Sequence, residues 1–240
     1  MRVGGSVADL LNEDSQLPIR LHGGLPSLTF DLTKTALLCV DMQRHLATPR
    51  SGPKAEAAKA LGLEAELEYY WSRLELATRN LRLMQDAFRR AKLEVVHSRG
   101  GRLTPDGRDR GPMKSQLMAG RSLPNGQREF RALDTEIIDQ LAPLPRELVF
   151  EKNGATAFGM TRIDLALWQL DIEALVIGGV ITNQCVEATV RGAFDHGFGV
   201  LLVEDACATY SEELQRGTVR SIGDWFCKVV TTDEVLTWFA

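Results

Sequence analysis

The chain of 240 residues has few of the residues that build disulfide frameworks or metal sites, with only four cysteines and four histidines. The cysteines form no C-x-x-C pair and no metal-ligand spacing; they are Cys39, Cys185, Cys207 and Cys227. This pattern favours free thiols in a reducing, cytoplasmic compartment. No apolar run approaches the roughly 20 residues of a membrane span. Residues 1–20 also lack the apolar segment of a signal peptide.

An excess of positive charge is also absent. Lys and Arg number 28 against 32 Asp and Glu, which gives a formal net charge of −4 at pH 7 and a pI near 5.7. We therefore expect neither nucleic acid nor a membrane as a partner. The composition, 44% hydrophobic and 25% charged, is that of an ordinary globular protein, and the length suffices for one large domain with a substantial core.

Short β-rich runs alternate with helical patterns after residue 30, which predicts a parallel sheet covered by helices. The expected strands are residues 35–41, 93–98, 147–151, 174–181, 199–205 and 227–232. A long helical stretch is expected at about 54–91, and shorter helices at 160–171, 183–197 and 211–226. Residues 1–30 are polar and interrupted by Gly and Pro, so they are interpreted as an N-terminal arm preceding a domain at 31–240.

Residues 99–132 interrupt this alternation with a Gly-, Pro- and Arg-rich segment that has no clear periodicity. Loops of this length inside a compact domain are uncommon and often functional. One interpretation is a solvated surface excursion. The other is a lid or pocket wall that offers arginine to an anionic or carbonyl-rich substrate. The sequence leaves both open.

Three reactive side chains follow predicted strands at the end where open parallel sheets bind ligands. Asp41 closes the first strand, Lys152 follows the third, and Cys185 follows the fourth after a short turn. A charged residue in such a place is often only the first solvated position, and a buried cysteine is usually inert packing. The coincidence of all three favours a catalytic site. The other three cysteines are interpreted as packing.

Cys185 has a physical argument of its own. If Thr182 is the N-cap, Cys185 lies in the first helical turn, where the amides are free and the helix dipole is positive. Such a position is expected to lower the pKa of the thiol and to favour the nucleophilic thiolate. The same amides could hold an oxyanion, and a nearby Asp, ordered by a Lys, could accept the thiol proton. The preceding Gly178 and Gly179 are expected to permit close backbone packing.

The segments "TALLCVDMQ", "VFEKNGATAF", "GGVITNQCVEATVRGAFDHGF" and "LLVEDACAT" resemble the isochorismatase-like cysteine hydrolases, and the resemblance covers roughly residues 30–235. This superfamily includes nicotinamidases, N-carbamoylsarcosine amidase, and ureidoacrylate and biuret hydrolases. The resemblance implies an α/β fold of three layers, α/β/α, with a six-stranded parallel sheet in the order 3-2-1-4-5-6. Together with the N-terminal arm and the apolar last helix, it favours a homodimer or homotetramer.

The resemblance also implies roles for particular residues. The catalytic triad would be Asp41, Lys152 and Cys185. A non-proline cis peptide is expected between Val180 and Ile181, and it would turn the Ile181 N–H into the site beside that of Cys185. These two amides would form the oxyanion hole.

The cysteine narrows the reaction that the resemblance implies. Isochorismatases that cleave a vinyl ether lack a cysteine here, so Cys185 favours covalent hydrolysis of a C–N bond in a small amide, carbamoyl or ureido substrate. Ammonia or an amine would be released from a thioester-type intermediate. Nicotinamidases resemble one another in an Asp-x-His metal motif, and the four histidines here form no such pair; they are His22, His45, His97 and His196. We therefore expect no metal and no other cofactor.

Residues 97–109 resemble the corresponding stretch of ureide and biuret hydrolases in outline, which favours a carbamoyl or ureido substrate. Arg99 and Arg102 are then candidate substrate anchors, and Gln43 and Phe158 are candidate pocket walls because they lie close in sequence to triad residues. For each of the four, an ordinary surface position, or core packing for Phe158, is an equal alternative.

Three alternatives to this function remain open. The chain could hydrolyse another small metabolite in the manner of isochorismatases. A redox-active thiol at Cys185 is a second alternative, although no neighbouring cysteine in the sequence is placed to resolve its oxidised form. A binding protein without catalysis is the third, and it would require the loss of a triad residue that the sequence retains.

Overall fold

The computed structural model describes residues 2–3, 30–101, 104, 108–113, 132–223 and 225–240. Within these ranges the central sheet has six parallel strands in the order β5-β4-β3-β6-β7-β8. They are β3 (Thr35–Val40), β4 (Val95–Gly100), β5 (Leu148–Lys152), β6 (Ala174–Val180), β7 (Gly199–Ala208) and β8 (Lys228–Val230). Numbered from β3 onward, the order is 3-2-1-4-5-6, so the predicted topology is confirmed.

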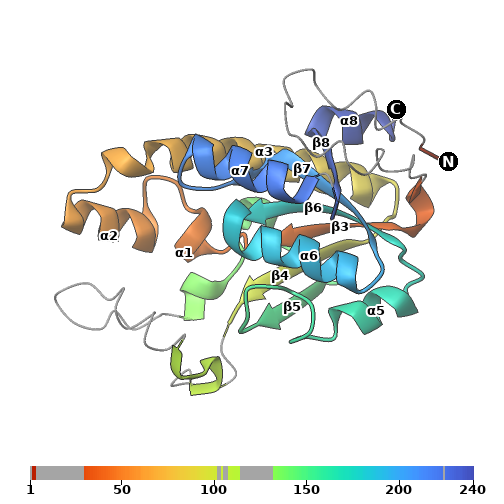
Figure 1. Ribbon diagram of the computed structural model, residues 1–240, viewed down its shortest axis with the longest axis horizontal. Helices are drawn as coiled ribbons and strands as arrows, with labels where there is room; N and C mark the ends of the chain where they lie inside the picture. The colour runs from red at the N-terminus through yellow and green to blue at the C-terminus, as the bar shows by residue number, and fades with distance from the viewer. Residues whose placement is uncertain (1, 4–29, 102–103, 105–107, 114–131, 224) are drawn as a thin grey trace.

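Helices cover both faces of this sheet and complete the predicted three layers (Figure 1). On one face lie α3 (Glu68–Arg90) and α8 (Thr232–Thr237); on the other lie α5 (Ile163–Gln169), α6 (Glu187–Asp195) and α7 (Glu212–Gly223). The strand β3 is buried along its whole length because successive side chains enter opposite layers. Leu37 and Cys39 pack towards α3, and Leu38 and Val40 pack towards α5 and α6.

The predicted helical stretch at 54–91 is divided into two helices. The first, α2 (Gly52–Leu61), ends at Gly62, whose φ of 68° is left-handed and whose N–H bonds the carbonyls of Ala58 and Lys59. Glycine adopts this conformation without steric cost and so ends a helix readily. The helix α1 (Arg44–Ala47) precedes α2, and a short 3₁₀ turn at Ala65–Leu67 leads into α3.

The remaining elements are short. An antiparallel pair joins β1 (Arg2–Val3) to β2 (Phe30–Asp31). The 3₁₀ turns are Leu32–Lys34, Arg108–Arg110, Ala132–Thr135 and Asp139–Leu141. Most of the predicted N-terminal arm and most of the 99–132 segment lie outside the described residues, so the interpretations of both stay predictions.

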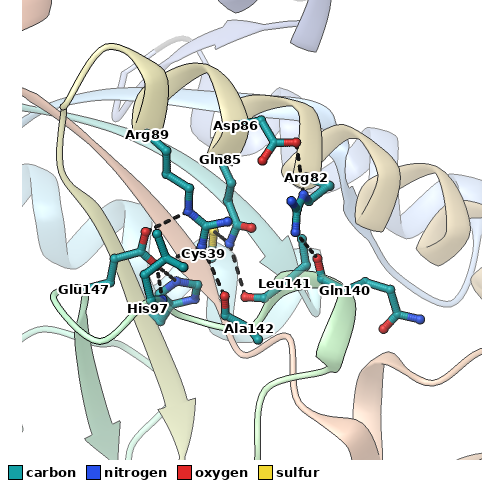
Figure 2. Close-up of polar contacts among 11 residues, drawn as sticks. Cys39, Arg82, Gln85, Asp86, Arg89, His97, Gln140, Leu141, Ala142 and Glu147 are labelled. Atoms are coloured by element: carbon teal, nitrogen blue, oxygen red, sulfur yellow. Dashed lines mark hydrogen bonds and ion pairs between the residues drawn. The ribbon is translucent and has the colours of Figure 1, made fainter.

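A buried carboxylate fastens the start of β5, the edge strand that ends in Lys152 (Figure 2). The Glu147 carboxylate accepts two hydrogen bonds from Arg89 of α3, at 2.8 and 2.9 Å, and one from the Leu144 amide at 2.8 Å. The Nε2 atom of His97 lies 3.4 Å away, and the Glu147 and His97 side chains are 3% and 1% exposed. Burial acts to raise the pKa of Glu147, but hydrogen bonds from His97, Arg89 and Leu144 outweigh it and hold the pKa at about 2.

The substitution Glu147→Gln is expected to lower the free energy of unfolding at pH 7 by about 3 kcal/mol, because it leaves Arg89 without its carboxylate. The folded pKa of Glu147 lies below the ordinary value of 4.5. Its stabilising contribution is therefore complete above pH 4.5 and is lost as the pH falls from about 4.5 towards 2. Urea unfolding at pH 7 and at pH 3 measures this, and the difference between wild type and variant should shrink at pH 3.

The matched control for this prediction is Glu151→Gln. The Glu151 carboxylate pairs with Arg99 at 2.9 Å on a surface where both side chains are about one third exposed. Such a pair contributes roughly 1 kcal/mol or less. A loss for Glu147→Gln that is no larger than this, or one that is equal at both pH values, would contradict the stabilising role of the buried network.

Candidate active site

Three strand ends bring Asp41, Lys152 and Cys185 together at the carboxyl edge of the sheet. Asp41 follows β3, Lys152 ends β5, and Cys185 lies in a π-helical turn, Thr182–Val186, directly after β6. The Nζ atom of Lys152 is 2.7 Å from Oδ2 of Asp41, and these side chains are 1% and 2% exposed. The Cys185 thiol interacts with both groups by charge and by hydrogen bonding. The three side chains named from the sequence thus form one cluster.

Asp41 is held by the neighbouring strand β4. Its backbone N–H donates to the Ser98 carbonyl at 3.0 Å, and the Ser98 hydroxyl donates to Oδ1 of Asp41, also at 3.0 Å. Asp41 has a φ of 52°, a left-handed conformation that Asp tolerates better than most residues. With Oδ1 bound to Ser98 and Oδ2 to Lys152, both carboxylate oxygens have fixed partners.

Ser98 is a positioning residue that the sequence analysis missed. It is wholly buried, and it ends the predicted strand 93–98 at the same edge as Asp41. A polar residue at the end of an adjacent parallel strand is therefore the signal that would have found it.

The ammonium of Lys152 is held by several acceptors. Besides Asp41, it donates to the carbonyls of Gly154 at 3.1 Å and Ala155 at 2.7 Å. An ammonium has three N–H donors, so these three acceptors fix its position beside the carboxylate. Lys152 is thereby placed to order Asp41 and to stabilise its negative charge.

The expected lowering of the Cys185 pKa is wrong. Burial, and after it the negative charge of Asp41, raise the pKa of the Cys185 thiol to about 12, while Lys152 acts in the opposite direction. A desolvated thiol beside a carboxylate resists ionisation because a second negative charge would have to form there. The thiol is therefore neutral at pH 7, and its attack on a substrate requires a base.

The helix start also differs from the prediction. Ile181, and not Thr182, is the N-cap residue, and the Thr182 hydroxyl donates to Oε1 of Gln215 at 2.7 Å. The Ile181 carbonyl accepts from the amides of Gln184 and Val186, at 3.0 and 3.2 Å. The second of these bonds spans five residues, which makes the turn wider than an α-helical one.

The peptide bond between Val180 and Ile181 is cis. Ile181 lies four residues before Cys185, directly after the pairing of Val180 at the end of β6 with Ala208 of β7.

Gln43, a candidate pocket wall, is a buried structural link. Its Nε2 donates to the carbonyls of Gly100 at 2.8 Å and Thr135 at 2.7 Å, and its Oε1 accepts from the Gly100 amide at 2.7 Å. Both amide hydrogens are consequently used, so Gln43 joins the end of β4 to the turn before β5 and has no free N–H for a substrate.

The other three candidates for substrate binding have different surroundings. Arg99 forms the partly exposed pair with Glu151, which is the surface position that the sequence left open. Phe158 is 1% exposed and packs against Phe198, with ring centroids 5.7 Å apart, in the core on the α5–α6 side of the sheet. Phe158 thus has the core position that the sequence left open as the alternative to a pocket wall. Arg102 lies outside the described residues.

The four cysteines differ in exposure. All are free thiols, and Cys185 is the one that is not fully buried. In the described part of the chain, no three His, Cys, Asp or Glu side chains gather in a way that could hold a metal ion. Within the same ranges, no helix has the length and apolar character needed to cross a membrane.

The fold and this cluster define an α/β protein with reactive side chains at the switch point of a doubly wound sheet. The Isochorismatase domain family model matches residues 35–234, and the chain belongs to this hydrolase family.

Individual relatives agree with this assignment. Nicotinamidase 3 of Arabidopsis thaliana is 30% identical over 195 residues, which cover 80% of this chain and 93% of the relative. A cysteine hydrolase from Pseudomonas syringae pv. phaseolicola 1448A has the same fold, with a TM-score of 0.68 and 23% identity over 88% of this chain and 94% of that one. N-carbamoylsarcosine amidase from Thermoplasma acidophilum matches with a TM-score of 0.55 and 24% identity over 83% and 97% of the two chains.

Proposed function

We propose that this chain is a cysteine hydrolase that cleaves a C–N bond of a small amide, carbamoyl or ureido substrate and releases ammonia or an amine. The observation that carries the proposal is the buried Asp41–Lys152 pair with the Cys185 thiol beside it. A nucleophile, its base and a group that orders the base stand within hydrogen-bonding reach of one another. Membership of a hydrolase family supports the same conclusion.

In the first half of the proposed reaction, the Cys185 sulfur attacks the substrate carbonyl carbon as Asp41 takes the thiol proton. The base is needed because the pKa of the thiol is about 12. The carbonyl electrons move to oxygen, and the backbone N–H groups of Ile181 and Cys185 hold this oxyanion. The C–N bond then breaks, and Asp41 gives its proton to the leaving nitrogen. A thioester remains on Cys185, or a thiocarbamate if the substrate is a ureide.

In the second half, water attacks the acyl carbon while Asp41 accepts one of its protons. The C–S bond breaks, and the proton passes from Asp41 to the sulfur. The products are a carboxylic or carbamic acid and the free thiol. Lys152 and Ser98 keep the carboxylate of Asp41 in place throughout both proton transfers.

Nicotinamide hydrolysis is a second candidate function, because a relative named nicotinamidase aligns with 80% of the chain. It uses the same triad and the same thioester chemistry on an aromatic amide. The two candidates share the triad and differ in the substrate, and the absence of an Asp-x-His pair in this sequence favours the first.

The test is ammonia release at pH 7 from biuret, ureidoacrylate, N-carbamoyl amino acids, nicotinamide and simple aliphatic amides. Intact-protein mass after a rapid acid quench should show the acyl group of one substrate on Cys185, because the thioester-type intermediate survives acid better than it survives neutral water. Turnover of nicotinamide alone would establish the second candidate. Turnover without any adduct on Cys185 would contradict the covalent mechanism.

A further inference from the structure

Lys54 lies between two tyrosines, Tyr70 and Tyr210. Lys54 of α2 donates to the hydroxyl of Tyr210 at 2.8 Å. Its ammonium also lies over the rings of Tyr210 and Tyr70, 4.8 and 5.3 Å from their centroids. Within the described ranges, no carboxylate lies within ion-pair distance of Lys54. The rings stabilise the ammonium, and no carboxylate in the described part of the chain pairs with it.

Tyr210 places this cluster at the carboxyl edge of the sheet. It follows β7 by two residues, and Ala208 at the end of β7 pairs with Val180 at the end of β6. Thr209, the residue between, donates its hydroxyl hydrogen to Oδ1 of Asn183 at 2.6 Å. Asn183 belongs to the same turn as Cys185. One hydrogen bond therefore links the residue next to Tyr210 with the turn that carries the nucleophile.

His45, the residue before Leu46, is affected by the charges of both Lys54 and Asp41. Burial chiefly lowers the pKa of His45; the charge of Lys54 also lowers it, and the charge of Asp41 raises it. His45 therefore lies within electrostatic range of both groups. The Tyr70 hydroxyl donates to the carbonyl of Leu46, the next residue along the chain, at 2.9 Å.

Counting the described residues alone, Lys54 and Tyr210 each have hydrogen-bond donors that meet no acceptor. Lys54 donates one of its three N–H groups to the Tyr210 hydroxyl. Because the Tyr210 oxygen accepts that bond, its own O–H proton remains free to donate to another acceptor. Two adjacent donors, one of them charged, match the two oxygens of a carboxylate. A neutral amide group would not neutralise the positive charge of the ammonium.

We infer that Lys54 and Tyr210 bind a carboxylate of the substrate whose C–N bond is cleaved at Cys185, so that the substrate is an N-carbamoyl or ureido acid. This inference rests on the proposed function and assigns its substrate class. It gives the role of anion anchor to Lys54, because Arg99 already pairs with Glu151. If the cluster only holds α2 against the sheet, removing it would affect anionic and neutral substrates equally.

The test compares two ureides of equal length, 3-ureidopropionate and the neutral 3-ureidopropanol. Lys54→Met should raise KM for the acid about 10- to 100-fold more than KM for the alcohol, the range for a hydrogen bond to a charged group. Tyr210→Phe should have a smaller effect of the same sign, and Lys54→Arg should restore part of the preference. Equal effects on both ureides, or none on either, would overturn the inference even if Cys185-dependent turnover upheld the proposed function.

Calorimetric binding to Cys185→Ala separates the inference from the reaction, since no turnover occurs in that variant. The same preference for 3-ureidopropionate over 3-ureidopropanol should appear there and should be lost in Cys185→Ala/Lys54→Met. If this preference is found but wild type hydrolyses neither ureide nor any other amide, the carboxylate site stands and the proposed function falls. If 3-ureidopropionate does not bind at millimolar concentration, the carboxylate site falls.

Discussion

Replacing Cys185 with alanine should reduce ammonia release by at least about 10⁴-fold in kcat, because the covalent route then has no nucleophile. Asp41→Asn should cost nearly as much. The pKa of the buried thiol is about 12, so at neutral pH almost no thiolate exists unless Asp41 removes the proton. The matched control is Cys227→Ala, which removes a buried thiol in the core and should leave the rate within about twofold.

The pH dependence of Asp41→Asn distinguishes a base from a merely structural carboxylate. Without the base, attack depends on the thiolate population, which rises about tenfold per pH unit below the thiol pKa. The residual rate should therefore increase steeply from pH 7 to pH 10, whereas the wild-type rate should not. Removing the charge of Asp41 also removes one cause of the raised pKa of Cys185, so the increase should level off below pH 12. A variant with near wild-type activity at pH 7 would show that the thiol ionises without Asp41.

The resemblance to the isochorismatase-like hydrolases predicted the sheet order, and the residues at the strand ends favoured a cluster of Asp41, Lys152 and Cys185. Each of these residues closes or follows a β-rich run, and parallel strands deliver their carboxyl ends to one edge, so topology places all three at that edge, although β4 lies between β5 and β3. The electrostatic balance at Cys185 does not follow in this way. A helix start favours the thiolate, but burial and the adjacent Asp41 oppose it, and their size depends on packing that no motif encodes.

The contacts that the sequence left out join distant segments. Lys54 and Tyr210 are 156 residues apart, and no spacing rule relates them. Ser98 and Asp41 are 57 residues apart, although both lie at predicted strand ends, so a search of all strand ends would have paired them. The end of the helix at Gly62 was only partly predictable. A glycine inside an amphipathic pattern is compatible both with a continuous helix and with a cap.

The substitution Gly179→Ala should destabilise the protein by more than about 4 kcal/mol, beyond the range of ordinary point changes. Gly179 in β6 pairs with Val40 in β3, at the centre of the sheet. A Cβ atom there would lie 2.1 Å from the Val40 carbonyl oxygen and 2.7 Å from its nitrogen, and both are backbone atoms of a buried strand. The φ of 136° is also one that residues with a side chain rarely adopt.

The control for this prediction is Gly217→Ala in α7, where an added Cβ meets nothing within 4 Å. Alanine is favoured over glycine within a helix by about 1 kcal/mol, so this variant should be as stable as wild type or slightly more so. Urea unfolding of both variants gives the comparison, and a Gly179→Ala protein of wild-type stability would refute the close approach of β3 and β6. That approach also sets the spacing of the site, since Asp41 follows Val40 and Cys185 follows β6. Any Gly179→Ala protein that folds by separating these strands should therefore lose its hydrolase activity together with its stability.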